Sequence, residues 1–339
     1  MYDTLLILFL LLLGFSVIAL MLVNDLFVLI LITGLISVLT GIIYILFDAV
    51  DVALTEIAVG AGISTILFLI TMSLTKAYHI DGYNPIQRFS RIAPVNLINA
   101  GLLLVVFLLI LDALSYAPIF GNMDTPANSS IIYKVYTKTS YETFDVQNSV
   151  TMILGAFRGY DTLGEAIVIL TGAIGTYLVM QIDKLEKSEE ISENTSSKNE
   201  TPKDYVISAT IFTLMPILLL FAFYIQFHGD FGPGGGFQSG VMIAASYFLI
   251  ILYFGKTIAN KFIDIKYLVF LAALGVLIFS ITGLVGMLLG GKYLDYSVLA
   301  SNTSSGYHLG LFSIELGVGT TVFAATAIII SQFYGKLKN

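Results

Sequence analysis

Three glutamates, Glu56, Glu165 and Glu315, lie inside apolar segments that are long enough to cross a lipid bilayer. Placing a charged side chain at the centre of a membrane costs roughly 2.5–3.5 kcal/mol even on lenient scales, so such a group normally faces a partner, a water-filled cavity or an ion path. Removal from water favours the neutral carboxyl group, and an arriving cation or water favours the ionised one. The chemistry that these residues favour is therefore the loading and release of protons or cations.

Glu56 follows two aspartates at the start of its segment and precedes Gly60 by one helical turn. Residues four apart share a helix face, so a neighbouring helix can approach at the glycine and shield the carboxylate. The alternative for Glu56 is a buried structural hydrogen bond. Asp51 stands near the membrane boundary, where either solvation or a place in an ion pathway is open to it.

Arg158, Asp161 and Glu165 are spaced three and four residues apart, which on a continuous helix places them in one stripe. We expect the arginine at the interface and the glutamate deepest in the membrane. Asp161 has two candidate roles, as a helix N-terminal charge or as an ion-handling group. The glycines that follow, Gly172 and Gly175, predict a close helix contact.

The segment 228–240 contains His228, Pro233 and the glycines Gly234, Gly235 and Gly236. It lacks the Lys-Ser/Thr pair of a phosphate-binding loop. Proline followed by three glycines instead predicts a sharp re-entrant turn with free N–H groups, which is tolerated at membrane depth where it is buried in protein or faces water. His228 could relay protons there or form a hydrogen bond at the end of a helix.

These residues are positioned by a strongly apolar chain of 339 residues, of which 57% are hydrophobic and 12% charged. Continuous apolar runs such as residues 5–13 exclude the alternating pattern of barrel strands. We therefore predict an all-α membrane helix bundle with about nine transmembrane helices. The predicted spans are 4–23, 26–47, 52–74, 95–116, 160–182, 205–226, 236–255, 266–290 and 308–334. The first lacks the basic start of a signal peptide, so we expect it to be a helix of the bundle.

The loops carry lysine and arginine unevenly. If the N-terminus is outside, 12 of the 16 basic residues lie inside and the other 4 outside. This bias predicts an N-out, C-in orientation in a cell membrane. On that topology Glu56, Glu165, His228 and Glu315 all fall in the outer half, which predicts an outward-facing polar cavity.

Polar segments divide the chain into modules. We predict a three-helix module at 1–94, a two-helix module with an interfacial helix at 95–182, a charged cytoplasmic linker at 183–204 and a four-helix module at 205–339. The chain has no cysteine and only three histidines, so we expect no cofactor within it. Basic stripes typical of nucleic-acid binding are absent from the sequence.

Three stretches carry a family resemblance: DVALTEIAVGAG at 51–62, RGYDTLGE at 158–165 and GPGGGFQSG at 232–240. Together they resemble the Mrp-type multisubunit cation/proton antiporters and the related membrane-bound hydrogenase and sulfane-reductase complexes. The first two resemble the C-terminal part of the large A subunit and the third resembles the smaller B subunit. The resemblance implies a fusion of these parts, with Glu56 and Glu165 at matching acidic positions, while the family's B-like last helix often has aspartate near Glu315.

The same resemblance implies a non-catalytic subunit that lines an ion or proton pathway, with Na⁺ as a transported ion near Glu56 and Glu165. Its partners would be other membrane subunits, including large antiporter-like proton-translocating subunits, and the lipid bilayer. The parent complex is either a free-standing antiporter or a redox enzyme. Two alternatives stay open: a self-contained secondary cation transporter and a purely structural membrane scaffold.

Overall fold

The computed structural model describes residues 2–78, 94–119, 121–122, 124–190 and 205–337. Within these ranges the chain is helical, without β-strands. The α-helices are α1 (Tyr2–Leu22), α2 (Leu26–Leu46), α3 (Val50–Glu56), α4 (Thr65–Thr75), α6 (Pro94–Ser115), α7 (Pro126–Ser129), α8 (Ile131–Lys138), α9 (Ser149–Met152), α10 (Gly159–Glu190), α11 (Tyr205–His228), α12 (Gly236–Phe254), α13 (Lys256–Phe262), α14 (Ile265–Leu288) and α15 (Thr303–Leu337). Three π-helical segments, η1 (Ile57–Ser64), η2 (Thr139–Thr143) and η3 (Ile153–Phe157), and the 3₁₀ turn η4 (Tyr296–Val298) complete the described elements.

Nine helical segments in the described ranges are long and apolar enough to cross a membrane, which confirms the predicted polytopic bundle. The third of them, Val50–Thr75, is built from α3, η1 and α4 in succession. Each expected span overlaps one of these helices, because runs of about 20 apolar residues are the strongest structural signal that a sequence carries.

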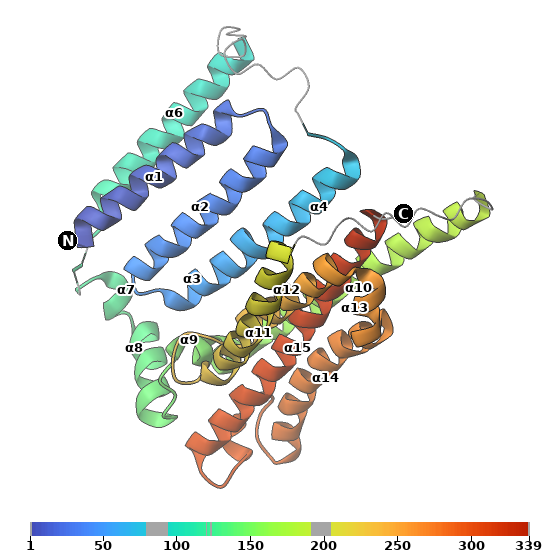
Figure 1. The fold of residues 1–339 in the computed structure, drawn as a ribbon. Helices are drawn as coiled ribbons and strands as arrows, with labels where there is room; N and C mark the ends of the chain where they lie inside the picture. Colours follow the sequence, from blue (N-terminus) through green and yellow to red (C-terminus); the bar gives the residue numbers. More distant parts are fainter. Residues whose placement is uncertain (1, 79–93, 120, 123, 191–204, 338–339) are drawn as a thin grey trace.

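Helices α10 to α15 pack into a bundle, and α1 to α4 lie in a layer beside it, with α6 beyond them (Figure 1). Helix α15 lies at the centre, since it packs against α10, α12 and α14 and also meets α4. It is the most buried of the nine apolar helices in the described chain, with 61% of its span enclosed.

Small residues let α15 occupy that central place. A methyl group added at Gly240 of α12 would lie 2.6 Å from the Gly319 carbonyl oxygen, and one at Gly317 would lie 2.6 Å from the Gly275 carbonyl oxygen of α14. Backbones can approach this closely only where side chains are absent. Farther along α15, Ala324, Ala325 and Ala327 are fully buried.

The layer formed by α1 to α4 contacts the bundle through the span Val50–Thr75. In this span α3 and η1 contact α12, and α4 contacts α15. By contrast, the described side chains of α6, from residue 98 to residue 115, are all exposed. Gly172 and Gly175 of α10 also differ from expectation: a methyl group at either would meet no described atom within 4 Å. Within this chain they are not a close helix contact.

The segment expected to hold an interfacial helix contains two different structures. Helix α8 has no buried residue, as suits a surface position. In contrast, α9 and η3 are packed into the protein: Met152 is fully buried, and a methyl group at Gly155 would press on Leu311 and Ile314 of α15. This second part is therefore a structural element of the bundle.

Candidate functional site

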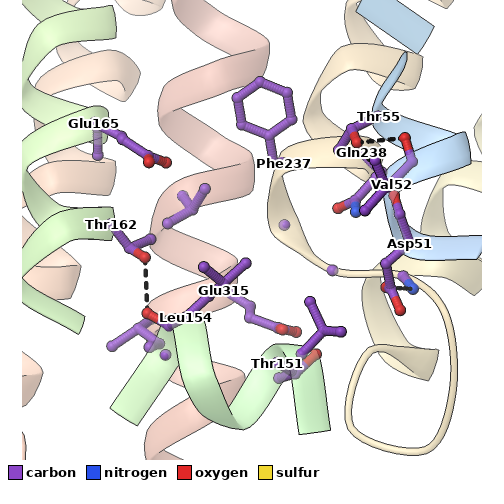
Figure 2. Close-up of a pocket in the computed structure, with 18 of the residues that line it drawn as sticks. Asp51, Val52, Thr55, Thr151, Leu154, Thr162, Glu165, Phe237, Gln238 and Glu315 are labelled. Atoms are coloured by element: carbon purple, nitrogen blue, oxygen red, sulfur yellow. Dashed lines mark hydrogen bonds between the residues drawn. The ribbon is translucent and has the colours of Figure 1, made fainter. Parts of the chain in front are cut away.

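A cavity of about 390 Å³ lies between α3, α10, α15 and the glycine-rich turn that precedes α12. Four acidic residues line it: Asp51 and Glu56 from α3, Glu165 from α10 and Glu315 from α15. Figure 2 shows Asp51 and Glu165 on opposite sides of this space, with Glu315 between them near Thr151. Four of the six predicted pathway residues thus come together from three helices that are far apart in the sequence.

Asp51 is partly buried and holds the glycine-rich turn in place. Its Oδ1 accepts a hydrogen bond from the Gly234 backbone N–H at 2.9 Å and a longer one from Asn148 Nδ2 at 3.5 Å. Asn148 Nδ2 also donates to the Gly232 carbonyl oxygen at 2.8 Å, so one amide connects both ends of the turn with Asp51. The carboxylate has a definite structural partner in place of the solvation considered above.

Glu56 stands where α3 passes into the π-helical segment η1. A methyl group at Gly60 would lie 3.0 Å from Glu56 Oε1 and would overlap the hydroxyl group of Ser37 on α2. The expected close approach of a neighbouring helix at Gly60 is therefore confirmed. Short π-helical segments within α-helices are rare and frequently occur at functional sites.

Glu315 is partly buried and faces the glycine-rich turn. Methyl groups at Gly229 and Gly235 would lie 2.7 Å from Glu315 Oε2 and 3.3 Å from Glu315 Oε1, so the carboxyl group would have to shift to accommodate them. Gly235 also has φ of 135°, which other residues rarely adopt. The Thr151 hydroxyl beside Glu315 donates to the Gly229 carbonyl oxygen at 2.8 Å. The turn is thus fitted to a carboxyl group at this position.

Glu165 lines the cavity and is exposed, with its side chain directed from α10 toward the space beside Glu315 (Figure 2). Asp161, one turn earlier, does not line the cavity: it accepts a hydrogen bond from Arg158 Nε at 2.7 Å, and both side chains are more than half exposed. The two acidic residues of this stripe therefore have different surroundings. Asp161 is engaged in an ion pair with Arg158 near the helix start.

His228 also lies outside the lining of the cavity. Its ring stacks on Tyr224 with centroids 4.9 Å apart, and its carbonyl oxygen accepts hydrogen bonds from Phe231 and Gly232 N–H groups, both at 3.0 Å. The residue ends α11 and begins the turn. Pro233 is exposed at the turn's tip, whereas residues 234–236 are buried.

Sequence reasoning missed a carboxylate–imidazole pair beside the cavity. His308 Nδ1 lies 2.9 Å from Asp230 Oδ2, while Asp230 Oδ1 is buried without a hydrogen-bond partner in the described chain. Burial raises the pKa of Asp230, and the hydrogen bond with His308 partly offsets this effect. The available signal was that His308 precedes Glu315 by seven residues, so that both share a face of one helix.

The described residues contain no group of three or more His, Cys, Asp or Glu side chains arranged to hold a metal ion. This finding concerns clusters of three or more such groups, so a transported Na⁺ near Glu56 and Glu165 stays a prediction. A transported cation would have to be coordinated in addition by carbonyl oxygens, hydroxyl groups or water, which are common ligands of hard cations.

The fold and the cavity define a multi-pass helical membrane protein with several acidic residues gathered around one cavity. Residues 206–328 match the family described as a domain related to the MnhB subunit of the Na⁺/H⁺ antiporter, and residues 11–77 match the MbhD family, the D subunit of MBH. The chain thus joins an MnhB-like region and an MbhD-like region, and the resemblance inferred from the sequence motifs is confirmed.

Individual relatives agree with this assignment. The chain is 29% identical to the B subunit of the Na⁺/H⁺ antiporter of Alkalihalophilus pseudofirmus, over 38% of this chain and 96% of that protein. It is also 29% identical to the A1 subunit of the Na⁺/H⁺ antiporter of Staphylococcus haemolyticus, over 49% of this chain but 19% of the relative. Among solved structures, the fold is similar to the Mrp complex from a Dietzia species, with a TM-score of 0.70 and 19% identity over 95% of this chain and 34% of that chain.

A second solved structure with a similar fold is the membrane-bound sulfane sulfur reductase, described as an archaeal respiratory membrane complex. The TM-score is 0.54 with 23% identity, over 71% of this chain and 99% of that chain. The chain spans 60%, 19% and 22% of the lengths of three curated relatives that it matches. It therefore corresponds to a part of these proteins.

Proposed function

We propose that this chain is a non-catalytic membrane subunit of a multisubunit Na⁺/H⁺ antiporter, or of a respiratory complex that contains antiporter-like subunits. In this proposal Glu56, Glu165 and Glu315 line a pathway for protons or cations. The observation that carries it is the cavity in which these residues meet Asp51. Intramembrane carboxylates are costly, and residues that share a cavity can exchange protons or cations through the water it contains.

The position of Glu165 favours a subunit over a self-contained transporter. This residue lies within an apolar span, lines the cavity and is nevertheless exposed in this chain. Facing lipid, it would bear the cost of an uncompensated charge in hydrocarbon. Another membrane subunit packed against this part of α10 would cover the carboxyl group and continue the pathway. The relatives that are named as A1 and B subunits of antiporters support the same conclusion.

The scaffold alternative has one specific observation in its favour, which concerns Asp51. This carboxylate accepts hydrogen bonds from Gly234 and Asn148, so part of its role is to fix the turn. Glu315 and Glu165 have no comparable hydrogen bonds from backbone N–H groups among those found in the described chain. We assign the exchange of protons or cations to these glutamates and a mainly structural role to Asp51.

The test is ion transport by the purified native complex in liposomes that contain a pH-sensitive dye. An imposed NaCl or KCl gradient drives proton movement, and single variants Glu56→Gln, Glu165→Gln and Glu315→Gln replace one carboxyl group each. We expect each variant to assemble and to lose at least about tenfold in rate, since a positioned proton-transfer group contributes ~10²–10⁴-fold.

Glu142→Gln is the matched control, because Glu142 is exposed and does not line the cavity. The proposal is abandoned if the three cavity variants transport like this control in an intact complex. Loss of assembly without loss of rate per assembled complex would instead indicate a scaffold. Transport by this chain reconstituted alone would indicate a self-contained transporter.

A further inference from the structure

The pair formed by Asp230 and His308 lies next to Glu315, at the end of the bundle where α11 ends and α15 begins. His308 Nδ1 is 2.9 Å from Asp230 Oδ2, and the side chains are 27% and 13% exposed. The imidazole thus has contact with the surroundings of the protein, and the carboxyl group is more enclosed. A phenyl ring, that of Phe231, lies nearly parallel to the imidazole, with ring centroids 5.8 Å apart.

Asp230 connects this pair to the cavity. The preceding residue, Gly229, is so close to Glu315 that an added methyl group would lie 2.7 Å from its Oε2. Asp230 is near enough to Glu315 to interact with it electrostatically. His308 and Glu315 are seven residues apart on α15, roughly 10 Å along the helix axis. Asp230 therefore stands between an accessible imidazole and a carboxyl group inside the cavity.

The free oxygen of Asp230 distinguishes this pair from an ordinary surface ion pair. Asp230 Oδ1 is buried and has no hydrogen-bond partner among the described residues. An unsatisfied buried acceptor costs about 1–3 kcal/mol. Binding of a proton or access of water to this oxygen relieves that cost. Burial also raises the pKa of Asp230, which favours the protonated carboxyl group in the folded protein.

We propose that Asp230 and His308 form a proton-transfer site that loads and unloads Glu315. A neutral imidazole that carries its proton on Nδ1 takes a proton from water at Nε2 and gives the Nδ1 proton to Asp230, which becomes a neutral carboxylic acid. The ring, now protonated on Nε2 alone, rotates to bring this N–H group to Asp230 for the next cycle. Asp230 then passes its proton to the Glu315 carboxylate and returns to the ionised form. The sequence of steps moves one proton inward without any oxidant or reductant. This inference rests on the function proposed above for Glu315.

Other titratable groups face the same region and set its electrostatic surroundings. Asp51 of α3 and Glu315 of α15 add negative charge, and Asp295, next to η4, lies close enough to influence Tyr307. His228 approaches the turn at Gly232 and stacks on Tyr224. It is an imidazole at the same end of the bundle without a carboxylate partner among the ion pairs of the described chain, which makes it a suitable comparison.

The test uses the same liposome assay with the native complex carrying His308→Ala, measured across a range of pH. At alkaline pH we expect the transport rate to fall by about 10- to 100-fold, because the site that transfers protons to Glu315 has been removed. At acidic pH the loss should shrink, since Glu315 can then be protonated directly. Imidazole added on both sides of the membrane should restore the rate at alkaline pH, because it replaces the missing ring.

His228→Ala is the control and should show neither the pH-dependent loss nor imidazole rescue. Asp230→Asn keeps the size of the side chain but cannot carry a proton, so it should show the same alkaline loss without rescue. If the complex with His308→Ala does not assemble, the pH dependence of transport by Asp230→Asn alone tests the inference. A wild-type pH profile in Asp230→Asn, or in an assembled His308→Ala, would overturn the inference.

The failure of this inference can be separated from the failure of the proposed function. If Glu315→Gln is inactive while His308→Ala and Asp230→Asn behave like the wild type, Glu315 belongs to the pathway and the relay is wrong. If Glu315→Gln retains wild-type transport, the pathway assigned to Glu315 is wrong, and the relay is rejected with it.

Discussion

The approach of α12 to α15 at Gly240 gives a quantitative prediction for the variant Gly240→Ala. The added methyl group would lie 2.6 Å from the Gly319 carbonyl oxygen, 3.0 Å from Val322 Cβ and 3.1 Å from the Phe323 nitrogen. Contacts of Cβ atoms below 3.0 Å are essentially never observed, so the helices must separate by at least 0.4 Å, the difference between 3.0 and 2.6 Å. Since the nearest obstacle is backbone, rotation of a side chain cannot relieve it.

Overpacking of this kind typically costs about 1–3 kcal/mol. At a helix position where the added methyl group meets no other atom, replacing glycine by alanine increases the free energy of unfolding by roughly 1 kcal/mol through helix propensity. Gly172→Ala on α10 is that open site, because no described atom lies within 4 Å of its added methyl group. The two identical substitutions should therefore change the free energy of unfolding in opposite directions.

The measurement is thermal unfolding of the purified full chain in detergent, monitored by circular dichroism. This method suits the protein because the sequence contains no tryptophan for fluorescence and no cysteine for labelling. At about 2 °C for each kcal/mol, Gly240→Ala should lower the midpoint by ~2–6 °C, while Gly172→Ala should leave it unchanged or raise it. If Gly240→Ala unfolds at the wild-type temperature, the close packing of α12 on α15 is incorrect.

Three further predictions concern groups around the cavity. Tyr296→Phe removes a buried hydrogen bond of 2.7 Å to the Gly155 carbonyl oxygen and should cost about 1–3 kcal/mol in the free energy of unfolding, measured by the same thermal method. Asp51→Ala should lower the unfolding midpoint more than Asp51→Asn, because the asparagine oxygen can still accept from Gly234 N–H; equal midpoints would argue against this hydrogen bond. Burial raises the pKa of Asp230 in the folded protein, so the folded state binds this proton more tightly than the unfolded state and the stabilisation is lost as pH rises through the raised pKa. As pH rises above the ordinary pKa of an aspartate, the wild type should therefore lose stability relative to Asp230→Asn, and parallel curves would contradict this prediction.

The number and type of helices could be predicted because long apolar runs leave the backbone few alternatives in a membrane. That Glu56, Glu165 and Glu315 come together could also be anticipated. Successive helices cross the membrane in alternating directions, which places these three residues at the same end of the bundle. The sequence alone could not show which neighbours each acid has. Asp161 and Glu165 are one turn apart, yet the first pairs with Arg158 and the second lines the cavity.

Contacts between distant segments were the part that pattern reasoning could not supply. Gly172 and Gly175 predicted a close contact but lie against open space in this chain, whereas Gly229 and Gly235 pack directly on Glu315. A glycine marks a place where a close approach is allowed, and only the tertiary arrangement shows whether it occurs. The pair of Asp230 with His308 was missed for the same reason, because 78 residues separate its members.

The glycine-rich turn explains why the acids of one cavity can have different tasks. Its Gly234 N–H group donates to Asp51 and fixes this side chain beside the turn. On the other side of the turn, Gly235 presents only space to Glu315. Among the described residues no backbone N–H group donates to this carboxyl group, so a change of its protonation state breaks no hydrogen bond to the backbone. The same turn therefore holds one carboxylate in place beside the cavity and leaves room for a second carboxyl group, which is an arrangement that the proposed stepwise passage of protons or cations would use.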